Sequence, residues 1–193
     1  MDKKNEILNA AYILFSEKGY SLSMSEIAET VNIKAPSIYS HFKSKDEIIE
    51  LIIKTEIEDC FDTIHKKALK LKDKSCEDKL KNILFYVIEY YAENNRLRFW
   101  RHISLLQNKN FRKMSKTLLE DCNHSFAEHI KICFDKGVKA REIKETVSEG
   151  QIYLYFAIIQ GILNASIFVH DNIKDIRSYA TSVWEAYWDG IKV

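Results

Sequence analysis

The residues with the clearest chemistry lie between Thr30 and Lys45, a stretch that contains three lysines and no acid. Lys34, Lys43 and Lys45 are interspersed there with hydroxyl groups and one imidazole. Ammonium and hydroxyl groups bind phosphate oxygens, and short side chains beside them can reach the edges of bases. The positive charge is local, because residues 1–48 as a whole carry six lysines and seven acids. The pattern therefore predicts a small nucleic-acid-binding patch and not a basic domain.

Two short helices joined by a tight turn are expected to position this patch. Ser23 and Glu26 have the spacing of a capping box, which predicts the start of the first helix. The turn contains Asn32, which tolerates a positive φ better than most residues. The second helix is expected over residues 35–42, with Ile38 facing inward. This is the layout of a helix-turn-helix, whose second helix lies in the major groove of DNA.

Composition and periodicity predict an all-α protein. The 193-residue chain contains one proline and five glycines, too few for a fold rich in turns, and its apolar residues recur at spacings of three and four. We expect about nine helices, in an N-terminal three-helix domain over residues 1–48 and a larger helical domain over residues 49–193. Beyond a polar break, helices are expected at 76–93, 96–107, 110–136, 148–169 and 174–190, with Gly137 ending the third.

Other classes of protein are disfavoured. The chain has no HExxH motif, no glycine-rich phosphate loop and no Ser, His and Asp in the order of a catalytic triad. We therefore expect neither an enzyme nor a cofactor. Residues 152–169 are strongly apolar but contain Gln160 and Asn164, which favours a buried helix over a membrane span. The four cysteines form no CxxC pair and the N-terminus has no signal-peptide pattern, which predicts reduced thiols and a cytoplasmic location.

The order of residues around the motif resembles the DNA-binding domain of the TetR family of bacterial repressors. The resemblance covers about residues 5–52 and is most specific in the run Tyr-x-His-Phe-x-Ser-Lys over residues 39–45. It includes Gly19-Tyr20 and the segments 10–15, 25–28 and 31–33. Two positions depart from the family pattern: Asn32 stands where glycine is usual, and Lys34 stands where a serine often caps the second helix.

The resemblance implies which residues contact DNA. The phosphate contacts would come from Ser25, Tyr39 and Lys45, and Lys43 is a further expected DNA-binding residue. The contacts with base edges would come from Lys34, Ala35, Ser37, Ser40 and His41. All six arginines lie at residue 96 or later, so the arginine–guanine fork, the commonest specific contact, is absent from the motif.

The larger domain is rich in aromatic side chains, and the resemblance implies that it contains a cavity for an inducer. The residues expected to line this cavity are Tyr86, Tyr90, Phe99, Trp100, His102 and Phe111. They indicate an apolar or aromatic ligand. Packing in the core is the alternative for each of them. The neighbouring Arg96, Arg98 and Arg101 could bind an acidic head group or simply lie on the surface.

A metal site is a weaker possibility. His129 and Cys133 are four residues apart on one predicted helix, and Cys122 lies on nearly the same face. This spacing could hold zinc. A buried thiol beside a surface histidine explains the same residues, and we expect no metal site.

Small residues recur every four positions at Ala157, Gly161 and Ala165, which lets another helix approach closely. Packing within one subunit would explain this stripe. The resemblance implies instead a two-fold, four-helix dimer interface, in which Val183, Trp184 and Tyr187 of the following helix take part.

Together these expectations describe a ligand-responsive transcriptional repressor. It would bind a pseudo-palindromic operator on double-stranded DNA as a homodimer, and a small, mostly apolar or aromatic inducer would release it. The alternative is a ligand- or metal-binding α-helical sensor whose helix-turn-helix is only structural. An enzyme is the third possibility.

Overall fold

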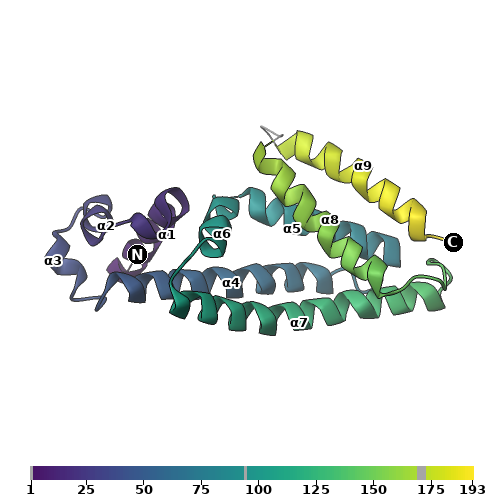
Figure 1. Cartoon of the computed structure of the whole chain (residues 1–193), viewed down its shortest axis with the longest axis horizontal. Coiled ribbons are helices and arrows are strands. Elements are labelled where there is room, and N and C mark those ends of the chain that lie inside the picture. Colours follow the sequence, from purple (N-terminus) through teal and green to yellow (C-terminus); the bar gives the residue numbers. More distant parts are fainter. Residues whose placement is uncertain (1, 94, 169–172) are drawn as a thin grey trace. The chain divides into compact units, whose positions relative to one another are not determined.

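The computed structural model describes residues 2–93, 95–168 and 173–193 (Figure 1). The helices in these ranges are α1 (Lys3–Lys18), the 3₁₀ turn η1 (Gly19–Ser21), α2 (Met24–Thr30), α3 (Ala35–Ile38), α4 (Lys45–Leu69), α5 (Cys76–Ala92), α6 (Arg96–Ser104), α7 (Lys109–Lys139), α8 (Glu149–Phe168) and α9 (Ile173–Ile191). The described part of the chain has no strand beyond a single bridge between Ile143 and Lys192. The all-α class is therefore confirmed, with nine α-helices in these ranges.

The chain packs as two compact units. Unit 1 comprises residues 1–60 and 94–121, and unit 2 comprises residues 61–93 and 122–193. The helices α4 and α7 contribute residues to both units. The expected division at residues 48 and 49 separates a DNA-binding part from a regulatory part by function, and it stays a prediction.

The core of unit 1 joins α1 to α6. The ring of Phe99, which is fully buried, stacks on Tyr12 with centroids 4.6 Å apart and packs at a tilt against Phe15 at 4.9 Å. The imidazole of His102 meets the edge of Phe15 at 5.9 Å. Helix α6 lies in the part of the chain expected to be regulatory, and its side chains pack against α1 in unit 1.

A buried carboxylate adds polar contacts to this core. Glu56 of α4 is 7% exposed, and its Oε1 accepts a hydrogen bond of 3.2 Å from the indole N–H of Trp100. The guanidinium of Arg96 lies 3.7 Å from the same oxygen. Burial and the negative charge of Glu56 raise the pKa of the Tyr12 hydroxyl, which also hydrogen-bonds to Glu56. The cluster thus connects α1, α4 and α6 through one carboxylate.

Unit 2 packs around Tyr155 of α8. This fully buried side chain donates a hydrogen bond of 2.8 Å to the carbonyl of Leu80 in α5, and burial raises the pKa of its hydroxyl. Its ring lies 6.4 Å from that of Phe134, 6.5 Å from Trp184 and 6.1 Å from Tyr187. Tyr155 therefore ties α5, α7 and α9 to α8.

The bounds of several helices differ from the sequence-based expectation. Helix α6 ends at Ser104, three residues early, and α8 ends at Phe168. Val169, the last residue expected in that helix, lies outside the described residues. No helix in the described ranges has the length and hydropathy required to cross a membrane.

Gly137 lies inside α7 and does not end it, so that expectation was wrong. The helix continues to Lys139, and the chain reverses at Arg141, which has a φ of 59°. A Cβ atom at residue 137 would lie 2.7 Å from Ile143 Cδ1 and 2.8 Å from Cys76 Sγ. The glycine is needed because these two side chains pack directly against the helix backbone.

Substitution of Gly137 by alanine tests this close contact. We expect Gly137→Ala to destabilise the protein by about 1–3 kcal/mol, because Cys76 and Ile143 must move. Gly190→Ala is the matched control, since a Cβ there meets nothing within 4 Å, and it should be neutral or stabilising by up to about 1 kcal/mol. Urea unfolding followed by circular dichroism measures both. Equal stability of Gly137→Ala and the wild type would show that the contact relaxes without cost.

Candidate nucleic-acid interface

Local hydrogen bonds set the first helix and turn of the motif. The hydroxyl of Ser23 accepts a bond of 3.2 Å from the Glu26 N–H, and the Glu26 carboxylate accepts one of 2.8 Å from the Ser23 N–H. The predicted capping box is therefore confirmed. Hydrogen bonds from the Lys18 ammonium, the Ser23 hydroxyl and the Ser23 N–H lower the pKa of the Glu26 carboxylate to about 2. Asn32 has a φ of 54°, as its residue type predicted, and Ile33 N–H closes the turn on the Ala28 carbonyl at 3.0 Å.

The second helix of the motif is shorter than predicted. Regular α-helix covers only Ala35–Ile38, whereas the sequence suggested residues 35–42. The hydroxyl of Ser40 donates to the carbonyl of Ser37 at 2.7 Å, and such a side-chain bond competes with the backbone pattern of a helix. The N–H groups of His41 and Phe42 still bond to the Ile38 carbonyl, at 2.8 and 2.9 Å. The helical path therefore continues as a series of turns.

The predicted contact residues are accessible to solvent. Ile38 and Phe42 are buried, as the inward positions of the motif require. The exposed residues are Ser25, Lys34, Ser37, Tyr39, Ser40, His41 and Lys43, and those of intermediate exposure are Ala35 and Lys45. Tyr39 is 58% exposed, so its ring and hydroxyl are open to solvent. The geometry is thus compatible with contact between residues 34–45 and a duplex.

Tyr20 holds the lysine at the start of α4, a role that the sequence did not predict. The ammonium of Lys45 donates a bond of 3.0 Å to the Tyr20 carbonyl and lies 4.1 Å from the centre of the Tyr20 ring. The hydroxyl of Tyr20 donates to Asp46 Oδ1 at 2.6 Å, and this bond raises the pKa of Tyr20. An ammonium has three N–H donors, so two remain for a phosphate. The Gly19-Tyr20 pair was part of the resemblance, but nothing in its spacing indicated this contact.

The start of α4 is capped in a modified form. Ser44 Oγ accepts from the Glu47 N–H at 3.2 Å, which is one half of a capping box. The Glu47 carboxylate bonds to the backbone N–H of Lys43, one residue before the position that a capping box uses. This contact fixes the backbone between the second helix of the motif and α4.

Comparisons with known proteins agree with this geometry. The family model described as bacterial regulatory proteins, tetR family, matches residues 7–52. IcaR of Staphylococcus aureus, the negative transcriptional regulator of the biofilm operon icaADBC, is 31% identical over a 166-residue alignment, and the match covers 84% of each chain. The chain belongs to the TetR family of bacterial regulatory proteins. It is therefore a transcriptional regulator, and the resemblance found in the sequence is confirmed.

Solved structures of other regulators share the fold over the whole chain. The regulator FadR of Bacillus subtilis, in complex with stearoyl-CoA, has a TM-score of 0.74 at 20% identity and covers 98% of this chain and 100% of its own. The ketosteroid regulator KstR2 of Mycobacterium tuberculosis has a TM-score of 0.74 at 15% identity, with 100% and 96% covered. At such identities the likeness shows the TetR-family fold alone.

The residues expected to line an inducer cavity belong to different units. Phe99 and His102 pack against α1 in unit 1, and Phe111 lies 5.9 Å from the Tyr20 ring there. Trp100 bonds to Glu56 in the same unit. Tyr86 and Tyr90 belong to α5 of unit 2, where Tyr90 is buried. For the four residues of unit 1, core packing accounts for the positions, and a ligand role stays a prediction.

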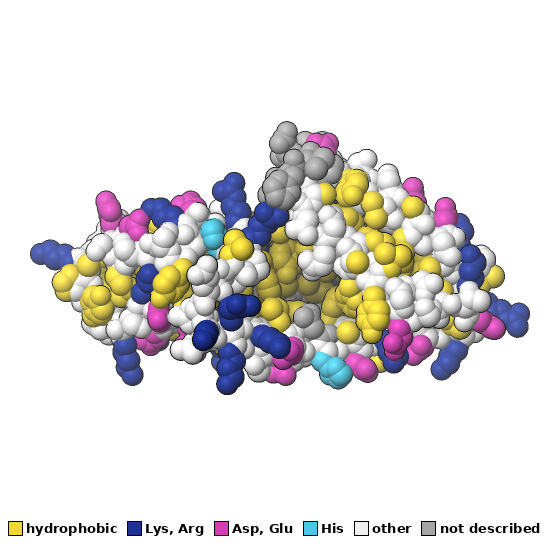
Figure 2. Space-filling view, in the orientation of Figure 1, with side chains coloured by type: hydrophobic (Ala, Val, Ile, Leu, Met, Phe, Trp, Pro, Cys, Tyr) yellow, Lys and Arg dark blue, Asp and Glu magenta, His cyan; other side chains and the backbone are white. Residues whose placement is uncertain are grey.

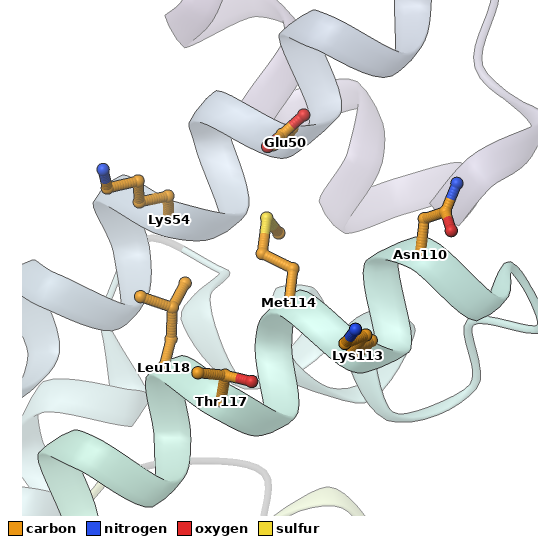
Figure 3. A pocket seen from close by; sticks show the side chains of 7 residues that line it. All are labelled: Glu50, Lys54, Asn110, Lys113, Met114, Thr117 and Leu118. Atoms are coloured by element: carbon orange, nitrogen blue, oxygen red, sulfur yellow. The ribbon is translucent and has the colours of Figure 1, made fainter.

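One groove of unit 1 opens between α4 and α7 and has a volume of about 500 Å³ (Figure 3). Its lining residues are Glu50, Lys54, Asn110, Lys113, Met114, Thr117 and Leu118. Met114 points from α7 toward α4, and charged groups of both signs surround it. This charged rim differs from the apolar cavity that the sequence predicted, and none of the six expected residues lines the groove.

The apolar surface of unit 2 lies on α8 and α9 (Figure 2). Tyr153 and Leu154 are 66% and 51% exposed. A groove of about 440 Å³ there is lined by Leu154, Ile158, Tyr179, Ser182, Val183, Ala186 and Tyr187. Ala157 and Gly161 are exposed, whereas Ala165 and Val183 are partly exposed. Trp184 is buried and stacks on Trp188 at 5.5 Å, so it supports this surface from inside.

The cysteine and histidine residues pair differently from the sequence-based possibility. The thiol of Cys133 lies 3.4 Å from that of Cys76 and not against His129. This contact, together with burial, raises the pKa of Cys76. The imidazole of His129 instead meets His65 of α4, with ring centroids 4.9 Å apart. Among the described residues no three His, Cys, Asp or Glu side chains gather as a metal site.

Two substitutions test the phosphate contacts. We expect Tyr39→Phe and Lys45→Ala to weaken binding to all DNA sequences alike, because phosphates carry no sequence information. Lys45→Ala should also reduce the slope of log K against log salt by about one unit. Fluorescence anisotropy over a range of salt concentrations measures both quantities.

Lys139→Ala is the control for Lys45→Ala, since it removes an exposed lysine from the last turn of α7 in unit 2. It should leave affinity and slope unchanged. If either substitution weakened binding only to DNA with a particular base at one position, the assignment of Tyr39 and Lys45 to phosphates would be wrong.

Proposed function

We propose that this TetR-family regulator is a ligand-responsive repressor that binds a pseudo-palindromic operator as a homodimer. The observation that carries the proposal is the exposed stretch 34–45, which places three lysines, Tyr39 and His41 on the surface while Ile38 and Phe42 anchor it. Repression is supported by the similarity to IcaR, which is a negative regulator. The protein acts in the cytoplasm, where its DNA target lies.

Base selectivity comes from short side chains. Lys34, Ala35 and Ser37 lie at the start of α3, where a recognition helix contacts bases, and Ser40 and His41 follow. The absence of arginine from the motif removes the strongest contact to guanine. The methyl group of Ala35 offers only an apolar surface, which suits the methyl group of thymine. The operator half-sites are accordingly expected to be recognised with modest selectivity.

Selection of bound sites from random duplex DNA tests this function. The expected product is a pair of inverted half-sites, with centres one or more helical turns of about 10–10.5 base pairs apart. Ala35→Ser should change the preference at one or two positions in each half-site, while Lys139→Ala changes none. Unchanged preference in Lys34→Ala, Ala35→Ser and Ser37→Ala would refute the base-reading role. Failure of the wild type to enrich any site would favour a sensor whose helix-turn-helix is structural.

The dimer forms through the apolar surface of α8 and α9. Exposed Tyr153 and Leu154 and the groove beside them form an apolar patch, and such patches mark interaction sites. Ala157 and Gly161 add small residues on α8. A second copy of the chain buries this surface in a dimer with closed two-fold symmetry, the commonest assembly of homo-oligomers.

Gly161→Leu separates an interface from a free surface. A Cβ at residue 161 meets nothing within 4 Å in the single chain. The larger side chain should therefore leave the fold of each subunit intact. In a close helix contact the larger side chain costs about 1–3 kcal/mol. Analytical ultracentrifugation should show a dimeric wild type and a weakened dimer in the variant. A monomeric wild type at micromolar concentration would rule out the proposed interface.

The inducer is a small, mostly apolar or aromatic molecule. The FadR structure contains stearoyl-CoA, which combines an apolar chain with an anionic head, and a related chemistry is consistent with the aromatic content of this chain. The candidate pocket residues of unit 2 are Tyr86 and Tyr90. A ligand can release the operator only through different affinities for the two states of the dimer.

A further inference from the structure

Two histidines face each other across the α4 and α7 helices of unit 2. The rings of His65 and His129 have centroids 4.9 Å apart and planes inclined at 85°. His129 is exposed and His65 is partly exposed, so the pair is open to solvent. About one turn earlier on both helices, Phe61 and Phe126 pack edge to face at 6.4 Å. This second ring contact fixes the register of the two helices and holds the imidazoles in place.

The hydrogen bonds of the pair leave nitrogen atoms available. The Nδ1 atom of His129 lies 2.8 Å from the carbonyl oxygen of Ser125. A carbonyl only accepts, so Nδ1 carries the proton and the Nε2 atom of the neutral ring has a free lone pair. Metal-binding histidines show this arrangement, in which the second ring nitrogen donates to a backbone carbonyl. In the described part of the chain, His65 makes no hydrogen bond or ion pair, and its ring meets that of His129.

The separation of the rings matches a shared metal ion. A tetrahedral ion bound at about 2.0–2.1 Å from each nitrogen lies about 3.2 Å from each ring centre, so the two centres are about 5 Å apart. The observed distance is 4.9 Å. Imidazole suits Zn²⁺, Ni²⁺ and Cu²⁺, whereas Ca²⁺ and Mg²⁺ prefer oxygen ligands.

We propose that His65 and His129 form a two-imidazole site for a divalent transition-metal ion, with water in the remaining positions. The site has one ligand on α4 and one on α7. It does not include Cys133, the partner that the spacing on α7 suggested for His129, because the Cys133 thiol lies against Cys76. The ion cross-links α4 to α7 in the folded protein. Since the unfolded chain does not hold the two imidazoles together, binding stabilises the folded state.

Calorimetric titration of the 193-residue chain with NiCl₂ tests the site. The expected result is one strong equivalent per chain in the wild type, and a rise in Tm of about 5 °C or more at one hundred times the Kd. His65→Gln and His129→Gln should each abolish both effects. His124→Gln is the control, because His124 is an exposed histidine of the same helix α7, and it should bind Ni²⁺ like the wild type.

Two results would overturn the proposal. One is Ni²⁺ binding that persists in both His65→Gln and His129→Gln, and the other is a wild type that binds no Ni²⁺ or is not stabilised by it. If His65→Gln fails to fold, His129→Gln decides alone, because the side chain of His129 is exposed and its loss leaves the core intact. The titration needs neither DNA nor an inducer, so its outcome is independent of the proposed function.

Discussion

The core of unit 1, which carries the residues proposed to contact DNA, depends on one buried ring from outside the motif, that of Phe99. This ring is fully buried and contacts both Tyr12 and Phe15 of α1. Loss of a buried phenylalanine side chain costs about 3–5 kcal/mol in well-packed cores. Helix α1 in turn belongs to the core of unit 1 together with α2 and the buried Ile38 of α3. The position of the residues proposed to contact DNA therefore rests on a side chain far along the sequence.

This packing suggests how a ligand would alter DNA binding in the proposed regulation. Glu56 connects Tyr12 of α1 to Trp100 of α6 through a buried carboxylate, and a buried network of this kind is costly to break in part. A ligand that favours a different position of α6 must also change the packing of α1. Coupling of this sort requires two alternative states and a ligand with a different affinity for each. The contacts of Phe99 and Glu56 are those that would differ between the two states.

The sequence predicted the features that local physics determines. The Ser23 capping box and the positive φ of Asn32 depend on neighbouring residues, and both are present in the structure. The shorter α3 also has a local cause, the Ser40 hydroxyl, but a helical pattern of apolar residues conceals it. The all-α class followed from composition and periodicity.

Features that depend on distant residues could not be predicted. The contact of Tyr20 with Lys45 joins residues 25 positions apart, and no pattern of spacing reveals it. Gly137 is a plausible helix end by residue type, yet its role is set by Cys76, far along the chain. Phe99 and Trp100 look like ligand-binding aromatics in sequence, and only the structure shows that they pack within unit 1.

Amide hydrogen exchange of a Phe99→Leu variant tests most directly whether α6 is part of the DNA-binding unit. We expect the amides of α1 and α2 to lose protection together with those of α6, while the amides of α8 and α9 in unit 2 keep theirs. Leu105→Ala, at a side chain that is 73% exposed, should leave the exchange pattern unchanged. Loss of protection limited to α6, with α1 and α2 as protected as in the wild type, would contradict the claim that Phe99 holds the motif in place.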